Sequence, residues 1–454
     1  MNANLNHIVP DTWCVERLGD FVISEKGKKP KNISKVKTKT YHLPYVNIKA
    51  FEKNIVDEYT DGVGCVLCEE NDFLMVWDGS RSGYIGKAIK GALGSTLVKI
   101  NFPGIVNDYA YYFLLSKYLQ INTRAKGTGT PHVDPDLLWN YRFPIAPYKE
   151  QKRVVEKIEE LFSDLEKGLE ILAKAQKQLE IYRQAVLKWA YEGKLTHGNI
   201  KESELPSGWE FVKTGDKIKP INNGYTPTKE FLSEGSGEIP FLKVYNLNFD
   251  GSLNSKKNPA FIPEAIHKKD LKRSICYPGD VLINIVGPPL GKVSVVTNEY
   301  PEWNINQAIV LFRPNENVRS KYISYFLQNH VTIQWLENTS KATAGQWNIK
   351  VSTCREIPFP YCPVEEQDKV IQEVERRLSV CDKIEEMIED SLKQAEALRY
   401  SILKKAFEGK LVPQDPNDEP ASILLQRIKA EKEKNKPVKM EMKTKTRTKL
   451  KEEA

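Results

Sequence analysis

The chain has 454 residues, of which 40% are hydrophobic and 28% are charged, and its formal net charge is +7. At roughly 150 residues per domain, this length favours two to four domains with cores of their own. The excess charge sits at one end, since eleven Lys or Arg and five Glu lie between Arg427 and the last residue, which leaves the rest of the chain nearly neutral. Net charge alone therefore does not indicate a nucleic-acid-binding protein.

The compartment is indicated by cysteine usage and by the apolar pattern. Seven cysteines are scattered along the chain, and the first residues lack the basic and then apolar pattern of a signal peptide. No apolar run approaches the ~20 residues of a membrane-spanning helix. We therefore expect a reduced, cytoplasmic protein without a membrane partner.

The first block, residues 1–148, alternates short β-like runs with Gly, Pro and Asn turns. The runs at 43–48, 73–77 and 96–100 are predicted strands, and 110–119 is a predicted helix. We expect a mixed, strand-rich α+β domain.

Two polar loops of this block are candidates for DNA contact. Seven lysines lie between residues 26 and 39 without one acidic residue, and residues 126–132 form a second loop that is small, polar and glycine-containing. Lysines in such a loop favour phosphate contacts, and the alternative is a solvated surface loop. The candidate DNA contacts of the first block are Lys26, Lys28, Lys29, Lys31, Lys35, Lys126, Thr128 and Thr130.

A long helix is predicted over 149–195 and again over 364–411. In both segments apolar or small residues recur every 3.5 residues on average, which is typical of a coiled-coil seam. Neither helix can bury its stripe alone, so each is the natural partner of the other. The predicted seam consists of Ile158, Leu161, Leu165, Leu172, Leu179 and Tyr182 in the first helix and Val374, Leu378, Ile384, Ile388, Leu398 and Ile402 in the second.

The chain order of block, helix, block, helix predicts an antiparallel pair with one block at each end of a rod. A helix of ~40 residues is roughly 60 Å long at 1.5 Å per residue. A dimerisation coiled coil and ordinary core helices are the alternatives that periodicity leaves open.

A linker at 196–204 leads to the second block, residues 205–363, with predicted strands at 239–244, 281–286 and 292–296 and a predicted helix at 320–328. Its polar loops carry amide, hydroxyl and aromatic groups, which can contact base edges as well as phosphates. The candidate DNA contacts here are Tyr225, Thr226, Thr228, Lys229, Lys341, Thr343, Gln346 and Trp347. The C-terminal extension, residues 412–454, is basic and is predicted to be disordered at its end.

The two halves of the chain are an internal repeat, which gives the predicted fold a pseudo-twofold symmetry. Trp13 matches Trp209 at a shift of 196, and Glu192 matches Glu408 at a shift of 216, so the second block is longer by 20 residues. Shorter matches join 27–30 with 224–227 and 86–87 with 291–292. Turn and core residues are shared while the segments between them differ, as expected for one scaffold that carries two different surfaces.

Motifs for catalysis are missing from the sequence. The Pro-Pro pair at 287–290 lacks the preceding Asn or Asp and the following aromatic residue of an adenine methyltransferase, and no phosphate-binding Gly-rich motif occurs. Cys65 and Cys68 have a metal-like spacing but no second pair nearby. Since the six histidines are dispersed, we predict a non-catalytic binding protein without a metal or cofactor of its own.

The order of these motifs, present twice, resembles the specificity subunit of type I restriction-modification systems. The resemblance covers residues 8–427, and the first block departs from it where a Lys-rich segment replaces the usual small-residue Gly-x-Pro loop. The residues that carry it are 206–209, 224–227, 240–242, Pro360, Pro363, 365–367 and 407–422.

The resemblance implies that each block is a target-recognition domain for one half of a split, asymmetric site on double-stranded DNA, and that the helix pair sets the gap between the halves. It also implies two partner methyltransferase subunits that use S-adenosylmethionine, and restriction/translocase subunits that use ATP and Mg²⁺ for cleavage. The competing interpretation is a coiled-coil scaffold whose blocks bind peptides. A third, the targeting part of a larger methyltransferase, requires the enzyme to be a separate chain.

Overall fold

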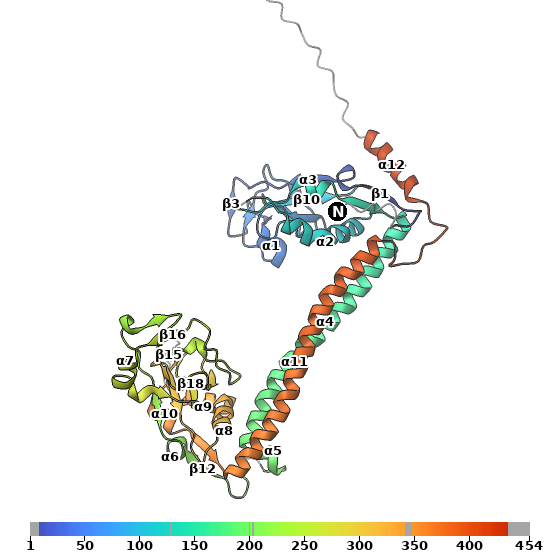
Figure 1. Ribbon diagram of the computed structural model, residues 1–454. Helices are drawn as coiled ribbons and strands as arrows, with labels where there is room; N and C mark the ends of the chain where they lie inside the picture. Colours follow the sequence, from blue (N-terminus) through green and yellow to red (C-terminus); the bar gives the residue numbers. More distant parts are fainter. Residues whose placement is uncertain (1–8, 128, 199, 202–203, 341–346, 435–454) are drawn as a thin grey trace, which may run out of the picture. The chain divides into compact units, whose positions relative to one another are not determined.

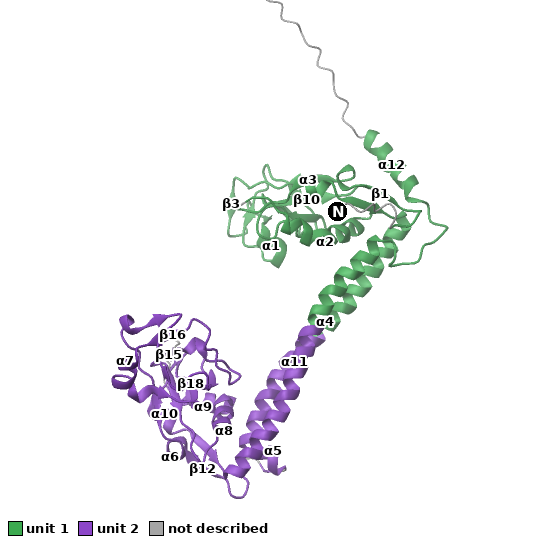
Figure 2. Cartoon of the chain, in the orientation of Figure 1, with its two compact units in different colours: residues 1–170, 392–454 green, residues 171–391 purple. Residues whose placement is uncertain are grey.

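The computed structural model describes residues 9–127, 129–198, 200–201, 204–340 and 347–434. The chain divides into two compact units, residues 1–170 with 392–454 and residues 171–391 (Figure 2). The boundary falls inside the long helices α4 (Tyr148–Tyr191) and α11 (Val364–Phe407). Each unit therefore contains one globular block and part of both long helices.

The first block is built from short strands and a few helices (Figure 1). Its strands are β1 (Cys14–Arg17), β2 (Ile23–Lys26), β3 (Ile33–Ser34), β4 (Leu43–Val46), β5 (Tyr59–Thr60), β6 (Leu67–Cys68), β7 (Phe73–Val76), β8 (Ile85–Lys87), β9 (Gly91–Leu93), β10 (Leu97–Asn101) and β11 (Arg142–Ile145). Its helices are η2 (Leu18–Asp20), α1 (Ile48–Lys53), α2 (Asn107–Thr123) and α3 (Pro135–Trp139).

The second block has the same kind of elements. Its strands are β12 (Glu210–Lys213), β13 (Ile221–Asn223), β14 (Ser233–Glu234), β15 (Ile239–Leu242), β16 (Ala260–Ile262), β17 (Ile275–Cys276), β18 (Val281–Asn284), β19 (Val286–Gly287), β20 (Val293–Val295), β21 (Trp303–Ile305), β22 (Ile309–Phe312), β23 (Trp347–Asn348) and β24 (Pro358–Tyr361). Its helices are α6 (Thr214–Lys217), η3 (Lys229–Phe231), η4 (Val244–Asn246), α7 (Glu264–Lys269), η5 (Lys272–Ser274), α8 (Ser320–Gln328), α9 (His330–Thr339) and α10 (Val351–Arg355), and α5 (Lys194–His197) precedes the block.

The repeat holds at the level of sheet topology. The four-stranded sheet runs β2-β10-β7-β8 in the first block and β13-β22-β18-β20 in the second. The five-stranded sheet runs β3-β5-β4-β9-β6 and β14-β16-β15-β21-β17, with one parallel pair in each case, β4 with β9 and β15 with β21. The predicted α+β class with two strand-rich, repeated domains is therefore confirmed.

One sequence match inside the repeat is wrong. Leu74 pairs with Gly86 on β8, and the corresponding Leu282 pairs with Ser294 on β20, so Gly86 corresponds to Ser294 and not to Gly291. Glycine is required at these two positions for different reasons. Gly86 lies in a strand where an added Cβ would sit 3.0 Å from the Phe51 ring, whereas Gly291 lies in a turn with φ of 89°.

In the first unit, aromatic residues join the block to the helix pair. Tyr109 on α2 is fully buried and its hydroxyl donates to the carbonyl of Pro144 at 3.0 Å. Phe407, at the end of α11, packs edge-on against Tyr109 and Phe113 with ring centroids 5.2 and 5.3 Å apart. The block therefore rests on the last turn of α11.

The second unit repeats this contact with the ends of the helices exchanged. Tyr322 on α8 donates to the carbonyl of Pro360 at 2.8 Å, and Tyr191, at the end of α4, packs against Tyr322 and Phe326 at 5.0 and 5.5 Å. Each block is thus anchored by the C-terminal end of the helix that follows the other block. This exchange is the physical form of the pseudo-twofold repeat.

In both units a glycine lies just after the long helix that makes this contact. Gly193, with φ of 71°, packs against Pro206 after the linker, and Gly409, with φ of 69°, packs against Pro10. The left-handed backbone at these positions is the usual way to stop a helix and favours glycine. In the first unit the contact joins the end of α11 to the start of the first block.

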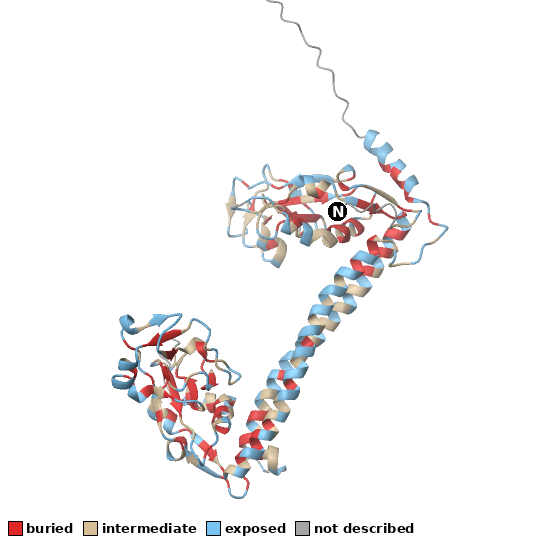
Figure 3. Cartoon of the chain, in the orientation of Figure 1, coloured by how far each residue is buried: buried red, intermediate tan, exposed pale blue. Residues whose placement is uncertain are grey.

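The predicted seam residues of α4 range from buried to exposed (Figure 3). Ile158 and Leu179 are buried, Leu161, Leu165 and Leu172 are partly buried, and Tyr182 is 37% exposed. Tyr182 still meets the other helix, because the guanidinium of Arg377 donates to its hydroxyl at 3.5 Å.

On α11 the predicted seam is wrong at two positions. Val374, Ile388 and Ile402 are buried and Leu378 is partly buried, but Ile384 is 40% and Leu398 is 50% exposed. The neighbouring charged residues take their place.

Charged side chains complete the seam because their apolar stems can cover the facing helix while their heads form ion pairs. Arg183 donates to Glu385 at 2.8 Å in the second unit. In the first unit, Arg399 lies over the Phe162 ring at 5.1 Å and pairs with Glu166 at 3.6 Å. A search for apolar spacing alone passes over such positions.

The C-terminal extension is partly folded. α12 (Ala421–Lys434) lies beside β1 (Figure 1), with Leu424, Leu425 and Ile428 buried and Lys429 paired with Glu16 at 3.1 Å. The part predicted to be disordered, residues 435–454, lies outside the described residues. Within the described ranges, no helix has the length and apolarity to cross a membrane.

Candidate nucleic-acid interface

In the first block, the two predicted DNA-contact loops meet at the turn after β7. The ammonium of Lys26, where the Lys-rich loop begins, lies 2.8 Å from the carboxylate of Asp78. Asp78 also forms a backbone bridge with His132, and Gly79 N–H donates to Pro131 O at 2.7 Å. Segments far apart in the sequence therefore form one surface.

The lysines on this surface differ in their freedom. Lys26 is held by Asp78, and Lys126 is held by Asp134 at 3.0 Å, where the hydrogen bond from the lysine lowers the pKa of the carboxyl group. The other predicted lysines of this surface are exposed, and no ion-pair partner for them lies in the described part of the chain: these are Lys28, Lys29, Lys31 and Lys35. Thr130 is exposed as well. Thr128 lies outside the described residues.

In the second block, the predicted loops meet at the turn between β21 and β22. Gln307 N–H donates to the Thr226 hydroxyl at 3.4 Å. Next to it, Ile285 N–H donates to Ala308 O at 2.8 Å, and Ile349 N–H donates to Ile285 O at 2.9 Å. The turn thereby connects the loop after β13 with the segment that contains β23.

The groups on this second surface are more varied than those on the first. Tyr225 is 63% exposed, Lys229 is exposed, and Trp347 is partly buried on β23. The Thr228 hydroxyl donates to Glu230 at 2.9 Å, so this threonine already has a partner. Lys341, Thr343 and Gln346 lie outside the described residues.

A close backbone approach fixes where both loops begin. A Cβ on Gly27 would lie 2.2 Å from the carbonyl oxygen of Gly94, and one on Gly224 would lie 2.1 Å from that of Ile305. No real Cβ comes so close to backbone atoms, so both positions require glycine for the same reason, and this explains why the two glycines match in the sequence.

Sequence reasoning missed residues that support the loops from a distance. Asp78 is 52 residues from Lys26, and Gln307 is 81 residues from Thr226. Only the repeated sheet order brings them together. Asp78 lies in the turn after β7 and Gln307 in the turn before β22, so a search for polar residues in the turns beside the buried strands of both copies could have found them.

Of the cysteine pair, Cys68 belongs to the core, whereas Cys65 is partly exposed. Cys68 is buried on β6, its thiol donates to the carbonyls of Ile89 and Gly91 at 3.4 and 3.5 Å, and burial raises its pKa to about 11. A thiol with this pKa is a poor metal ligand at neutral pH. Among the residues that the structure describes, no group of three or more His, Cys, Asp or Glu could hold a metal ion.

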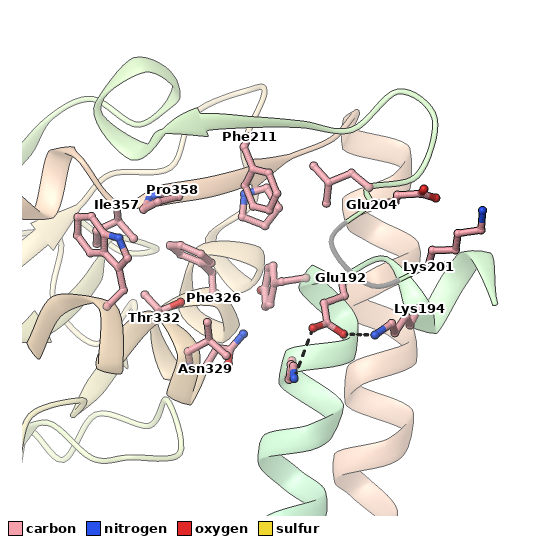
Figure 4. Close-up of a pocket in the computed structure, with 16 residues that line it drawn as sticks. Glu192, Lys194, Lys201, Glu204, Phe211, Phe326, Asn329, Thr332, Ile357 and Pro358 are labelled. Atoms are coloured by element: carbon pink, nitrogen blue, oxygen red, sulfur yellow. Dashed lines mark hydrogen bonds and ion pairs between the residues drawn. The ribbon is translucent and has the colours of Figure 1, made fainter. Parts of the chain in front are cut away.

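A separate pocket of about 470 Å³ lies in the second unit (Figure 4). Phe211, Phe326 and Ile357 form part of its lining, and Glu192 is held there by Lys188 and Lys194. None of the predicted DNA contacts that the structure describes lines it. The lining also includes Lys201, Glu204 and Thr332, while Glu192 is engaged by its two lysine partners.

A comparison with known protein families matches each of the two repeats separately. A family model described as the type I restriction modification DNA specificity domain matches residues 10–175 and 206–394, one match for each copy. The chain belongs to the type I restriction-modification DNA specificity family. The resemblance read from the sequence is thereby confirmed, and two specificity domains fit recognition of a bipartite DNA target.

Relatives of this specificity protein are similar to it over most of its length. The MjaVIII specificity subunit of Methanocaldococcus jannaschii is 26% identical over 424 residues, which cover 89% of this chain and 94% of the relative. The EcoBI specificity subunit of Escherichia coli is 26% identical over 387 residues, with 80% of each chain covered. The function of this chain is sequence specificity in a type I restriction enzyme.

Solved structures share the fold. The HsdS subunit from Thermoanaerobacter tengcongensis matches with a TM-score of 0.54 at 19% identity, covering 88% of this chain and 98% of that one. A chain in a structure of the type I R-M system matches with a TM-score of 0.67 at 20% identity, covering 88% and 99%.

Proposed function

We propose that the two domains of this specificity subunit read different half-sites by different chemistry. The observation that carries the proposal is that, in each domain, the two predicted DNA-contact loops meet to form one surface. The first presents the exposed lysines Lys28, Lys29, Lys31 and Lys35, and the second presents Tyr225, Thr226 and Lys229. Lysines bind phosphates without reading sequence, so base reading at the first half-site falls to other groups of that domain, whereas hydroxyl and amide groups at rigid positions of the second surface can read base edges.

The chemistry of modification and cleavage belongs in this proposal to partner chains. Two methyltransferase subunits bind the helix pair and use S-adenosylmethionine, and restriction/translocase subunits use ATP and Mg²⁺. This chain supplies sequence recognition and no catalytic group, and the complex works in the cytoplasm, where its DNA lies. The support is the pairing of two specificity domains with long helices, together with relatives that are named as subunits of type I restriction enzymes.

The experiment is co-purification of this chain with its methyltransferase subunit, followed by mapping of methylated adenines on genomic DNA. We expect two methyltransferase subunits for each specificity chain and methylation at one bipartite motif that disappears without this chain. Assembly without sequence-dependent methylation would instead support a coiled-coil scaffold.

Lys28→Ala combined with Lys29→Ala is expected to weaken binding to cognate and unrelated DNA by the same factor. Each lost phosphate contact should lower the slope of log K against log salt by about 0.9. Binding of the methyltransferase complex to both DNAs across a salt series measures this. Lys90→Ala, which removes an exposed lysine paired with Glu69 outside the loops, is the control and should change neither value. A changed sequence preference in the double variant would contradict phosphate contact.

A further inference from the structure

The strand that leads into the second recognition loop is an edge strand. β13 pairs with β22 on one side and ends at Asn223, directly before Gly224. The free edge of a sheet presents backbone carbonyls that need partners from elsewhere. Ile221 is buried in this strand, so the partner of its carbonyl has to come from a neighbouring element.

Arg355 supplies that partner. It ends α10 and its Nε and Nη2 donate to Ile221 O at 3.2 and 2.7 Å. The same Nη2 lies 3.3 Å from the Asn222 side-chain oxygen, and the Asn222 amide donates onward to Arg273 O at 3.4 Å. One guanidinium thus ties the entry of the recognition loop to the helix that follows the β23 segment.

The backbone behind Arg355 is also held. A Cβ on Gly215 would lie 3.0 Å from the Arg355 Cβ and 3.1 Å from its carbonyl oxygen, so α6 packs directly against this residue. Arg355 therefore extends from a fixed base, and its planar fork reaches two acceptors at once in a fixed geometry that the ammonium of a lysine does not provide.

The first domain has a different residue at the position of Arg355. The counterpart of Arg355 is Trp139, since Gly19 packs against Trp139 as Gly215 packs against Arg355. Trp139 stacks on Trp77 with ring centroids 6.2 Å apart and donates nothing to the edge of β2, whose residues are all exposed. The arginine clamp therefore distinguishes the second surface, the one with base-reading chemistry.

We propose that Arg355 is a positioning residue that sets the sequence discrimination of the second domain by clamping the entry of its recognition loop. The inference rests on the proposed function. Base readout depends on donor–acceptor distances near 3 Å, so a small shift of Thr226 or Tyr225 removes it, whereas contacts with phosphates tolerate such a shift.

The test uses the complete complex with its methyltransferase subunits, and compares Arg355→Ala with Arg355→Lys. Methylation rates are measured on the cognate target and on targets with one changed base in either half-site. Arg355→Ala should lower discrimination at the second half-site roughly tenfold, on the scale of one mismatched base pair, and leave the first half-site unchanged. Arg355→Lys should restore part of it.

Arg319→Ala is the matched control. Arg319 also lies in the second unit and makes a two-pronged contact with Asp368 at 2.9 Å, but its side chain touches neither recognition loop. This variant should keep both half-sites. If Arg355→Ala lowers stability or rate equally on all targets, or if it relaxes both half-sites alike, Arg355 is merely structural and the inference is wrong. If the unmodified chain directs no bipartite methylation, it is the proposed function that fails.

Discussion

Alanine in place of Gly224 is expected to destabilise the second unit by about 3 kcal/mol, the upper range for overpacking in a tight interior. The added Cβ would lie 2.1 and 2.2 Å from the carbonyl oxygens of Ile305 and Asn306, and backbone cannot move aside as a flexible side chain can. The measurement is urea unfolding of the whole chain, followed by hydrogen exchange to assign the loss to β13 and β22.

The control for this prediction has the opposite sign. Gly168 lies in α4 with nothing within 4 Å of an added Cβ, so Gly168→Ala should raise stability by about 1 kcal/mol through helix propensity. Gly27→Ala should resemble Gly224→Ala, but in the first unit, because its Cβ would lie 2.2 Å from Gly94 O. A Gly224→Ala chain that unfolds within 0.5 kcal/mol of the original, on the order of a neutral surface change, would contradict the close approach.

Much of the fold could be predicted because its signals are local or repeated. The buried strands β7 and β18 are short apolar runs, and they lie where the sequence predicts strands. The match of Gly27 with Gly224 marks one close contact in two places. Repetition makes such a signal stronger than either copy alone, since chance rarely preserves a glycine at both positions.

The rest could not be predicted because it depends on contacts between distant segments. Lys26 looks available for phosphate in the sequence, yet Asp78 neutralises it from the end of β7. The seam of α11 is displaced by one residue at Glu385 and Arg399, since charge at these positions hides their packing role. The Arg355 clamp follows the same rule, because it acts on a strand that lies 134 residues earlier.

The two recognition loops are held with different firmness where they begin, so the two domains should differ in how much loop movement their DNA contacts tolerate. In the first domain an exposed ion pair between Lys26 and Asp78 fixes the loop, and such pairs contribute little and weaken with salt. In the second, Arg355, itself an exposed residue, bonds to the backbone carbonyl of the buried Ile221. The first surface therefore suits phosphate contact, for which a movable loop is sufficient, and the second suits base reading.

Insertion of four residues after Ala175, together with four after Ser391, is expected to lengthen the spacer of the DNA target by about one base pair while both half-sites stay unchanged. Arg183 meets Asp382 and Glu385, so eight residues earlier on α4 the chain faces α11 near Ser391, and insertions at both places keep the residues on either side of them in register between the two helices. Four helical residues add ~6 Å and a net rotation of ~40°, since each residue turns about 100°. The rotation is close to the ~34° twist of one base pair at 10.5 base pairs per turn.

Mapping of methylated adenines with the altered chain checks this spacer directly. The matched control inserts four residues in α4 alone, which shifts one helix of the pair against the other and should abolish methylation. An unchanged spacer with the paired insertion would show that the helix pair does not set the distance between the half-sites. Rotation is the stricter of the two constraints. With one added base pair the ~40° rotation of the helix pair misses the DNA twist by only ~6° and the ~6 Å lengthening misses by ~3 Å, whereas with two added base pairs the rotation misses by ~28°. For this reason we expect one base pair rather than the two that length alone would suggest.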